Sequence, residues 1–186
     1  HELTTGHVTL GVAGIIIVRD EVEAALNLLR TYGVDDIPLI VQYRTFRNTG
    51  QINIVPMGDE VMVNAVFDAY TDVPAQMVRL RLLNGSVERV YNVGFSDDRM
   101  FYQIGSDGGL LEEPVAMNRL LIATGERAEI LVDLSGDNGS TLNLMSYGSE
   151  IPANIPGAAM GPGGPDNPLN GVDFDILELR VGEATA

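Results

Sequence analysis

The chain has 186 residues and a mass of 20.0 kDa, which is enough for one domain with a single core. Hydrophobic residues make up 45% of it and charged residues 20%, a composition typical of folded globular proteins. Eleven basic residues against 26 acidic ones leave a formal charge of −15, so the surface repels phosphate backbones and anionic lipids. We therefore expect no nucleic acid and no membrane among its partners, and its longest nearly uncharged stretch, residues 8–18, is too short to span a bilayer.

Metal ligands are scarce. The sequence has no Cys, which excludes disulfides, thiolate catalysis and any copper centre that needs a thiolate. The only imidazoles are those of His1 and His7, and their separation does not place them side by side on a strand. Because two ligands cannot close a stable zinc or copper site without another segment, we predict no metal site. We expect His7 to be a half-exposed residue of a strand.

The patterns in residues 8–43 predict strands joined by a connector. Residues 8–18 are rich in β-branched side chains and contain two Gly, which predicts a strand, a bend and a second strand with both faces covered. Between residues 21 and 30 apolar side chains recur at spacings of three and four, which predicts a short amphipathic helical turn. Residues 21–36 are therefore expected to form a connector, and residues 37–43 the next strand.

After residue 50 the sequence becomes a succession of short apolar runs separated by turn residues. Without long helical periods between them, these runs predict an all-β fold, an antiparallel Greek-key sandwich or barrel. Asn84-Gly85 predicts a hairpin between two of the strands, and Asp107-Gly108-Gly109 predicts another tight reversal. The predicted strands are residues 60–64, 76–83, 87–95, 101–106, 116–122, 128–134, 141–147 and 174–181.

The strand predicted at residues 76–83 alternates apolar and other residues, and residues 151–171 have the composition of a loop. In the strand at 76–83, Val78, Leu80 and Leu82 are predicted to face the core, and the Arg residues between them to face the other way. Residues 151–171 are rich in Pro and Gly and poor in apolar side chains. They are expected to form a long loop or a mobile lid with few apolar anchors.

Adjacent carboxylates are the first candidates for chemistry. To act as an acid and a base, or as a cation cage, they would have to converge in space. Neighbouring side chains on a strand point to opposite faces, so we expect all of these pairs to be solvated charges in turns or at sheet edges. The pairs are Asp35-Asp36, Asp97-Asp98 and Glu112-Glu113.

The remaining candidates have simpler interpretations. The seven Met are dispersed, which favours core filling over a cuprous site. Gly125-Glu126-Arg127 lacks a helix N-terminus that would make it a phosphate cradle. We therefore expect Arg127 to pair with a carboxylate of its own domain, either Asp107 or Glu129.

Five segments, taken together and in order, resemble the multicopper oxidases, three-domain cupredoxin enzymes that oxidise phenols or metal ions and reduce dioxygen to water. The first, GVAGIIIVRD, is similar to the end of the family's first domain, and YGVDDIPLIVQ to the crossing into the second. The others are similar to strand and turn signatures of the middle domain. The five segments are residues 11–20, 32–42, 79–85, 106–111, and 125–127 followed by 129–133.

The resemblance implies a division of the chain and a place for copper outside it. Residues 1–20 would be terminal strands of the preceding cupredoxin domain, 21–36 a linker and 37–183 the middle cupredoxin-like domain. The family's His-X-His pair lies just upstream of His1, and its other copper ligands lie in segments on either side of this stretch. The resemblance thus implies no catalytic, cofactor-binding or metal-binding residue here, with copper in the full-length parent.

The function expected from this resemblance is a copper-free, non-catalytic central scaffold in a periplasmic or extracellular multicopper oxidase, with the flanking copper-bearing cupredoxin domains as partners. Exposed strand edges within residues 1–20 also favour a homo-oligomer. One alternative is a cupredoxin-like binding module whose acidic face and Gly/Pro-rich loop engage a protein or glycan partner. Another is a carboxylate hydrolase, which would require a concave pocket holding a carboxyl group with a raised pKa.

Overall fold

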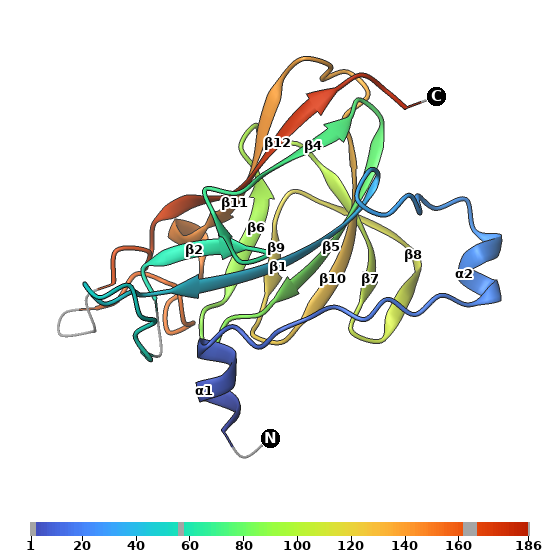
Figure 1. Cartoon of the computed structure of the whole chain (residues 1–186). Helices are drawn as coiled ribbons and strands as arrows, with labels where there is room; N and C mark the ends of the chain where they lie inside the picture. The colour runs from blue at the N-terminus through green and yellow to red at the C-terminus, as the bar shows by residue number, and fades with distance from the viewer. Residues whose placement is uncertain (1–2, 56–57, 162–166, 186) are drawn as a thin grey trace.

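The chain folds into two β-sheets, and the computed structural model describes residues 3–55, 58–161 and 167–185. Figure 1 shows the sheets enclosing a common interior, with the two short helices outside it. The seven-stranded sheet has the order β3 (Val66–Phe67), β2 (Glu60–Val63), β1 (Asp36–Arg44), β5 (Met77–Asn84), β10 (Arg127–Asp133), β7 (Phe101–Ser106) and β8 (Gly109–Met117). The five-stranded sheet has the order β4 (Tyr70–Pro74), β12 (Asp173–Gly182), β11 (Thr141–Tyr147), β6 (Tyr91–Phe95) and β9 (Leu120–Ile122).

The all-β sandwich is confirmed, but its sheets are mixed and not purely antiparallel. β1 runs parallel to β5, and β12 runs parallel to β4. A parallel pair needs a long crossover connection, and β2, β3 and β4 lie in the chain between β1 and β5. The sequence reveals most of the longer strands, whereas the partner of each strand depends on these crossovers.

The core lies between the sheets and follows the predicted alternation on β5. Val78 and Leu80 have no exposed surface and Leu82 is 2% exposed. Phe95 and Phe101, from opposite sheets, meet edge to face with ring centroids 5.7 Å apart. Arg79 and Arg81, on the other face of β5, are also buried, although nothing in the sequence indicates which residues cover that face.

Several strand predictions need correction. The predicted strand 116–122 is two strands of different sheets, β8 and β9, and the predicted strand 87–95 begins only at Tyr91. β3, β4 and most of β8 are missing from the prediction. β8 is an exposed edge strand that carries Glu112, Glu113 and Pro114, and such residues protect edges while lowering the β-strand signal.

The predicted hairpin at Asn84-Gly85 is wrong, because β5 and β6 belong to different sheets. Asn84 is buried where the chain crosses between them, and its side-chain amide donates to the carbonyls of Arg89, at 2.8 Å, and Ile122, at 3.0 Å. A Cβ atom on Gly85 would lie 3.0 Å from the side chain of Ile40. The Asn-Gly pair therefore serves a tight crossing. The reversal at Asp107-Gly108-Gly109 is confirmed and joins β7 to β8.

The predicted strands at residues 8–18 are absent. Residues 4–9 form helix α1 (Thr4–Thr9), so His7 is an exposed helical residue, and residues 12–20 have no regular secondary structure. Figure 1 shows this segment running in an extended course beside the seven-stranded sheet. β-branched residues favour a strand only where a partner edge is present, and no described strand pairs with this segment.

The helical turn is confirmed as α2 (Glu21–Ala25), whose first turn is capped by the carboxylate of Asp20 accepting from the Glu23 amide at 2.7 Å. A 3₁₀ helix, η1 (Gly148–Glu150), follows β11. None of the helices in the described ranges has the length and apolar character that a membrane crossing requires.

The Gly/Pro-rich segment is a loop, as predicted, but its described parts, 151–161 and 167–171, are firmly anchored. The Val90 amide donates to the Pro156 carbonyl at 3.0 Å, and the guanidinium of the buried Arg89 donates to the Leu169 carbonyl at 3.1 Å. Few apolar side chains anchor these parts, as expected, since Ile151 and Ala158 are the buried ones, and polar contacts supply the other anchors. The rest of the predicted lid lies outside the described residues.

Candidate functional site

The donor set does not fit copper. His1 lies outside the described residues, and His7 is exposed on α1. Within the ranges that the structure describes, no three His, Asp or Glu side chains gather in a way that would hold a metal ion. A chain without thiols and with two imidazoles lacks the soft and nitrogen ligands on which protein copper centres depend.

The three acidic pairs differ in burial and in their partners. Asp97 pairs with Arg99 at 2.7 Å, Asp98 pairs with Arg119 at 2.7 Å, and Glu112 and Glu113 are exposed on the edge strand β8. These are charges at turns and edges, as predicted. For Asp35-Asp36 the prediction is wrong, because Asp36 has no exposed surface and Asp35 is 8% exposed. Burial of Asp36 is possible because two arginines neutralise it.

Two smaller predictions can also be checked. Of its two candidate partners, Arg127 pairs with Asp107, at 3.2 Å. Core filling by methionine holds only in part: Met117 packs against the core, whereas Met100 and Met160 are exposed and Met57 lies outside the described residues.

An ion-pair network covers the outer face of β5 and was missed by the sequence analysis. Arg81 donates to Asp36 through Nε at 2.6 Å and to Glu129 through Nη1 at 2.6 Å. Arg79 donates to Glu129 through Nε at 2.9 Å and to Glu23 through Nη1 at 2.9 Å. The signal that would have revealed it is the pair of Arg residues two positions apart on a central strand, with acidic residues on both neighbouring strands.

The network extends to the connector before β1. Arg30 lies 3.3 Å from Glu23, and Arg19 lies 3.0 Å from Asp36. Burial would raise the pKa of Glu23, but hydrogen bonds and charge from Arg79 and Arg30 outweigh it and lower the pKa. Burial acts to lower the pKa of Arg79, and its bonds to Glu23 and Glu129 raise it instead. Both shifts favour the charged forms of Glu23 and Arg79.

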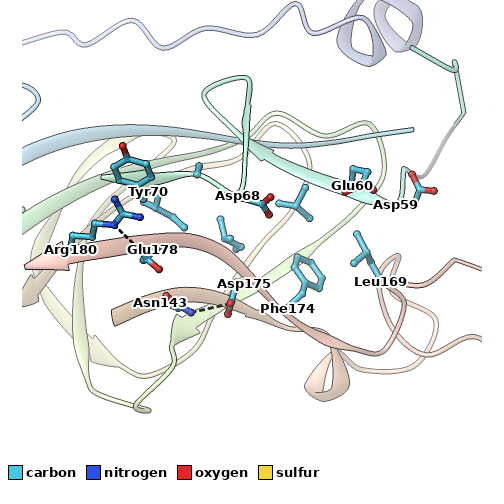
Figure 2. A pocket seen from close by; sticks show the side chains of 14 residues that line it. Asp59, Glu60, Asp68, Tyr70, Asn143, Leu169, Phe174, Asp175, Glu178 and Arg180 are labelled. Atoms are coloured by element: carbon cyan, nitrogen blue, oxygen red, sulfur yellow. Dashed lines mark hydrogen bonds and ion pairs between the residues drawn. The ribbon is translucent and has the colours of Figure 1, made fainter. Parts of the chain in front are cut away.

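A groove of about 460 Å³ lies between the ends of the two sheets. Figure 2 shows side chains approaching it from β2 and β4 on one side and from β11 and β12 on the other, with Leu169 of the Gly/Pro-rich loop at one end. Its apolar lining includes Phe174, Ile176 and Leu177. The groove combines apolar and charged side chains.

The groove is strongly acidic. Its single basic residue, Arg180, pairs with Glu178 at 2.6 Å and stacks over the Tyr70 ring with its guanidinium carbon 3.5 Å from the ring centroid. The carboxylates that line the groove are Asp59, Glu60, Asp68, Asp175 and Glu178.

Comparison with known proteins places the chain among longer ones. No family model matches it. It is 45% identical over 138 residues to the cell division protein FtsP of Xenorhabdus nematophila, covering 71% of this chain and 29% of that protein. FtsP of Dickeya dadantii is 42% identical over 142 residues, covering 73% and 30%.

Solved structures agree in fold over nearly the whole chain. The 2F4 variant of the McoA multicopper oxidase from Aquifex aeolicus is 37% identical with a TM-score of 0.81, covering 100% of this chain and 40% of that one. The laccase-like multicopper oxidase CueO from Ochrobactrum sp. is 31% identical with a TM-score of 0.77, covering 98% and 38%. The chain therefore spans less than a third of these two curated relatives and about two fifths of these two structures.

Proposed function

This chain belongs to the multicopper oxidase family and has a cupredoxin-like fold, and we propose that it is the copper-free central portion of a larger protein, in which it spaces and docks its neighbours. The observation that carries this proposal is the donor set, with no thiol, two imidazoles and no gathering of metal ligands among the described residues. Copper in the flanking domains would supply oxidation and dioxygen reduction, and this chain would supply their geometry.

The proposal includes a division of the chain. Residues 37–183 would form the middle domain, because the strands from β1 to β12 share one core. Residues 1–20 would belong with the preceding copper-bearing domain, since the extended stretch from residue 12 has no strand partner here. Residues 21–36 would link the two, and the parent would be a periplasmic or extracellular oxidoreductase.

Copper loading tests the central claim. The chain is incubated with Cu(II), passed over a desalting column and analysed for metal, alongside a His7→Ala variant. We expect much less than one copper per chain in both proteins, because neither has a set of ligands that closes a site. Retention of about one tightly held copper per chain by the unmodified protein would overturn the proposal.

A second candidate function is a binding module within a protein that is not an oxidase. The groove favours it, because acidic side chains surround an apolar floor and Leu169 brings the Gly/Pro-rich loop to its end. The FtsP relatives are named for cell division, and their identity of up to 45% exceeds the 37% identity to the McoA structure. On this reading the groove would hold a basic, apolar segment of a protein partner.

Binding of a synthetic peptide of alternating Lys and Leu, measured by calorimetry, tests the groove. The double variant Glu60→Gln/Asp68→Asn removes two charges at the groove, and Glu112→Gln/Glu113→Gln removes two exposed charges from the distant edge strand β8. We expect the first variant to weaken binding by roughly tenfold and the second by less than about twofold. Equal weakening would mean that only net charge matters and would refute this candidate.

The flanking sequence discriminates between the two candidates. His-X-His motifs in the reading frame on both sides of this chain would favour the oxidase scaffold over the binding module.

A further inference from the structure

We propose that the ion network around Arg79 is a clamp that holds the connector in one fixed course on the seven-stranded sheet, where the connector is taken as residues 19–30, that is, Arg19, Asp20 and the first ten residues of the predicted linker 21–36. The clamp is a property of this chain, and only its use, to set the direction in which the preceding domain leaves, rests on the proposed function. The connector would then be a rigid spacer and not a flexible tether.

Three polar contacts along the connector reach the sheet or its first strand. Arg19 at its start bonds to Asp36 at 3.0 Å. Glu23 in α2 accepts from Arg79 at 2.9 Å, and the Leu29 carbonyl accepts from the same guanidinium nitrogen at 3.3 Å. The contacts fall near the start, the middle and the end of the connector, so together they fix its path.

Hydrophobic burial does not hold the connector. Of the apolar side chains in its predicted helical stripe, Val22 is 73% and Leu26 45% exposed, and Leu29 is only half-buried. In residues 21–30 the only buried side chain is that of Glu23, at 8% exposure. A charged group therefore occupies the place that an apolar anchor normally takes. The connector stays attached because Glu23 is bonded to a buried arginine.

The clamp is able to open without unfolding the sheet. Arg79 is 1% exposed and keeps two bonds to Glu129 when Glu23 is removed, so its charge remains partly paired. Arg30 ties the connector to itself, through the carbonyls of Leu26, at 2.6 Å, and Leu28, at 2.8 Å. The connector thus behaves as a small cooperative unit, and Glu23 supplies the side-chain bond that ties its helical turn to β5.

Limited digestion with trypsin tests the clamp. The sequence has no Lys, so trypsin cuts only after Arg, and Arg19 and Arg30 both lie in the connector. In Glu23→Gln we expect cleavage after Arg30 to accelerate by roughly tenfold or more, because cleavage tracks the population of the open form. Cleavage after Arg47, in an exposed loop, is the internal reference, and cleavage after Arg79 or Arg81 reports unfolding of the sheet.

Glu21→Gln is the matched control, since Glu21 is exposed on the same helix and has no side-chain contact in the described structure. Acceleration of less than about twofold in Glu23→Gln, or equal acceleration in Glu21→Gln, would overturn the proposal. If Glu23→Gln unfolds the sheet, Arg30→Gln decides: we expect hydrogen exchange to quicken in residues 20–30 alone, and unchanged exchange there would overturn the clamp. The copper-loading experiment does not depend on how the connector is held, so it tests the proposed function separately from the clamp.

Discussion

Asp36 on β1 and Arg81 on β5 form a buried two-pronged ion pair on the outer face of the seven-stranded sheet, with Nε 2.6 Å from Oδ1 and Nη2 3.0 Å from Oδ2. The Asp36 side chain is fully buried and that of Arg81 is 8% exposed. The pair joins two parallel strands whose register places Asp36 opposite Arg79 and Pro38 opposite Arg81. Because both charges are desolvated, each depends on the other.

Asp36→Asn is expected to destabilise the protein by up to about 3–5 kcal/mol, because the buried Arg81 guanidinium loses one of its two carboxylate partners and keeps only Glu129. The free energy of unfolding in urea measures the effect. The same exchange at Asp98, whose side chain is 63% exposed and pairs with Arg119, is the control. It is expected to cost less than about 1 kcal/mol, as surface pairs do. Equal losses would show that burial of Asp36 contributes nothing to its pairing energy.

Leu80→Ala is expected to cost about 2–5 kcal/mol, because the side chain has no exposed surface and its removal leaves a cavity between the sheets. Leu121→Ala removes the same atoms from a side chain that is 46% exposed, and is expected to cost clearly less. Urea denaturation of both variants measures the difference. A loss below about 1 kcal/mol for Leu80→Ala would contradict the assignment of β5 to the centre of the core.

The apolar half of the fold could be predicted from sequence, as β5 illustrates. The alternation of Val78, Leu80 and Leu82 determines which face is buried, because a strand places successive side chains on opposite sides. The same alternation assigns Arg79 and Arg81 to an outward face, and this is correct. It does not reveal that the connector and Glu129 cover that face, because such pairing joins residues far apart in the chain.

Segments whose structure depends on a distant partner could not be predicted. Ile16 and its β-branched neighbours have strand propensity, yet no described strand pairs with them. Glu112 and Pro114 have low strand propensity, yet β8 forms because it pairs with β7. The groove was not predicted either, since its lining comes from β2, β4, β11 and β12, and only the sheet topology brings these strands together.

Asp97 makes stability depend on pH. Its hydrogen bonds with Arg99 outweigh burial and lower the pKa of its carboxyl group. A lowered folded pKa contributes stability that is present above the unfolded pKa of about 3.9 and is lost as the pH falls through the folded value. We therefore expect the stability difference between the unmodified protein and Asp97→Asn to be largest near neutral pH and to shrink at pH 3 and below. A stability difference that grows as the pH falls would mean that folding raises the pKa of Asp97. Urea denaturation across this range measures it.

Gly171 closes the anchored loop and tolerates no side chain. Its φ of +65° favours glycine, and a Cβ atom there would lie 2.5 Å from the Cβ of Ala159. Gly171→Ala is expected to destabilise the protein by on the order of 2 kcal/mol, through strain and overpacking. Gly136→Ala, at an exposed turn with open space around the Cβ position, is expected to be nearly neutral. Melting temperatures of the two variants make the comparison.

The extended stretch 12–18 is expected to drive self-association of the isolated chain. Ile16 is 91% and Val18 83% exposed, whereas the alternating residues Ile15 and Ile17 are only partly exposed and line a pocket with the sheet. A strip of outward apolar side chains without a described strand partner is suited to pairing with a second copy. Light scattering is expected to give about twice the mass of one chain for the unmodified protein and a single mass for Ile16→Ser/Val18→Ser. Val115→Ser/Leu121→Ser changes two apolar residues elsewhere that are 45% and 46% exposed, and should leave the mass unchanged. A monomer for the unmodified chain, or the same loss of mass in both variants, would show that this strip is not the contact.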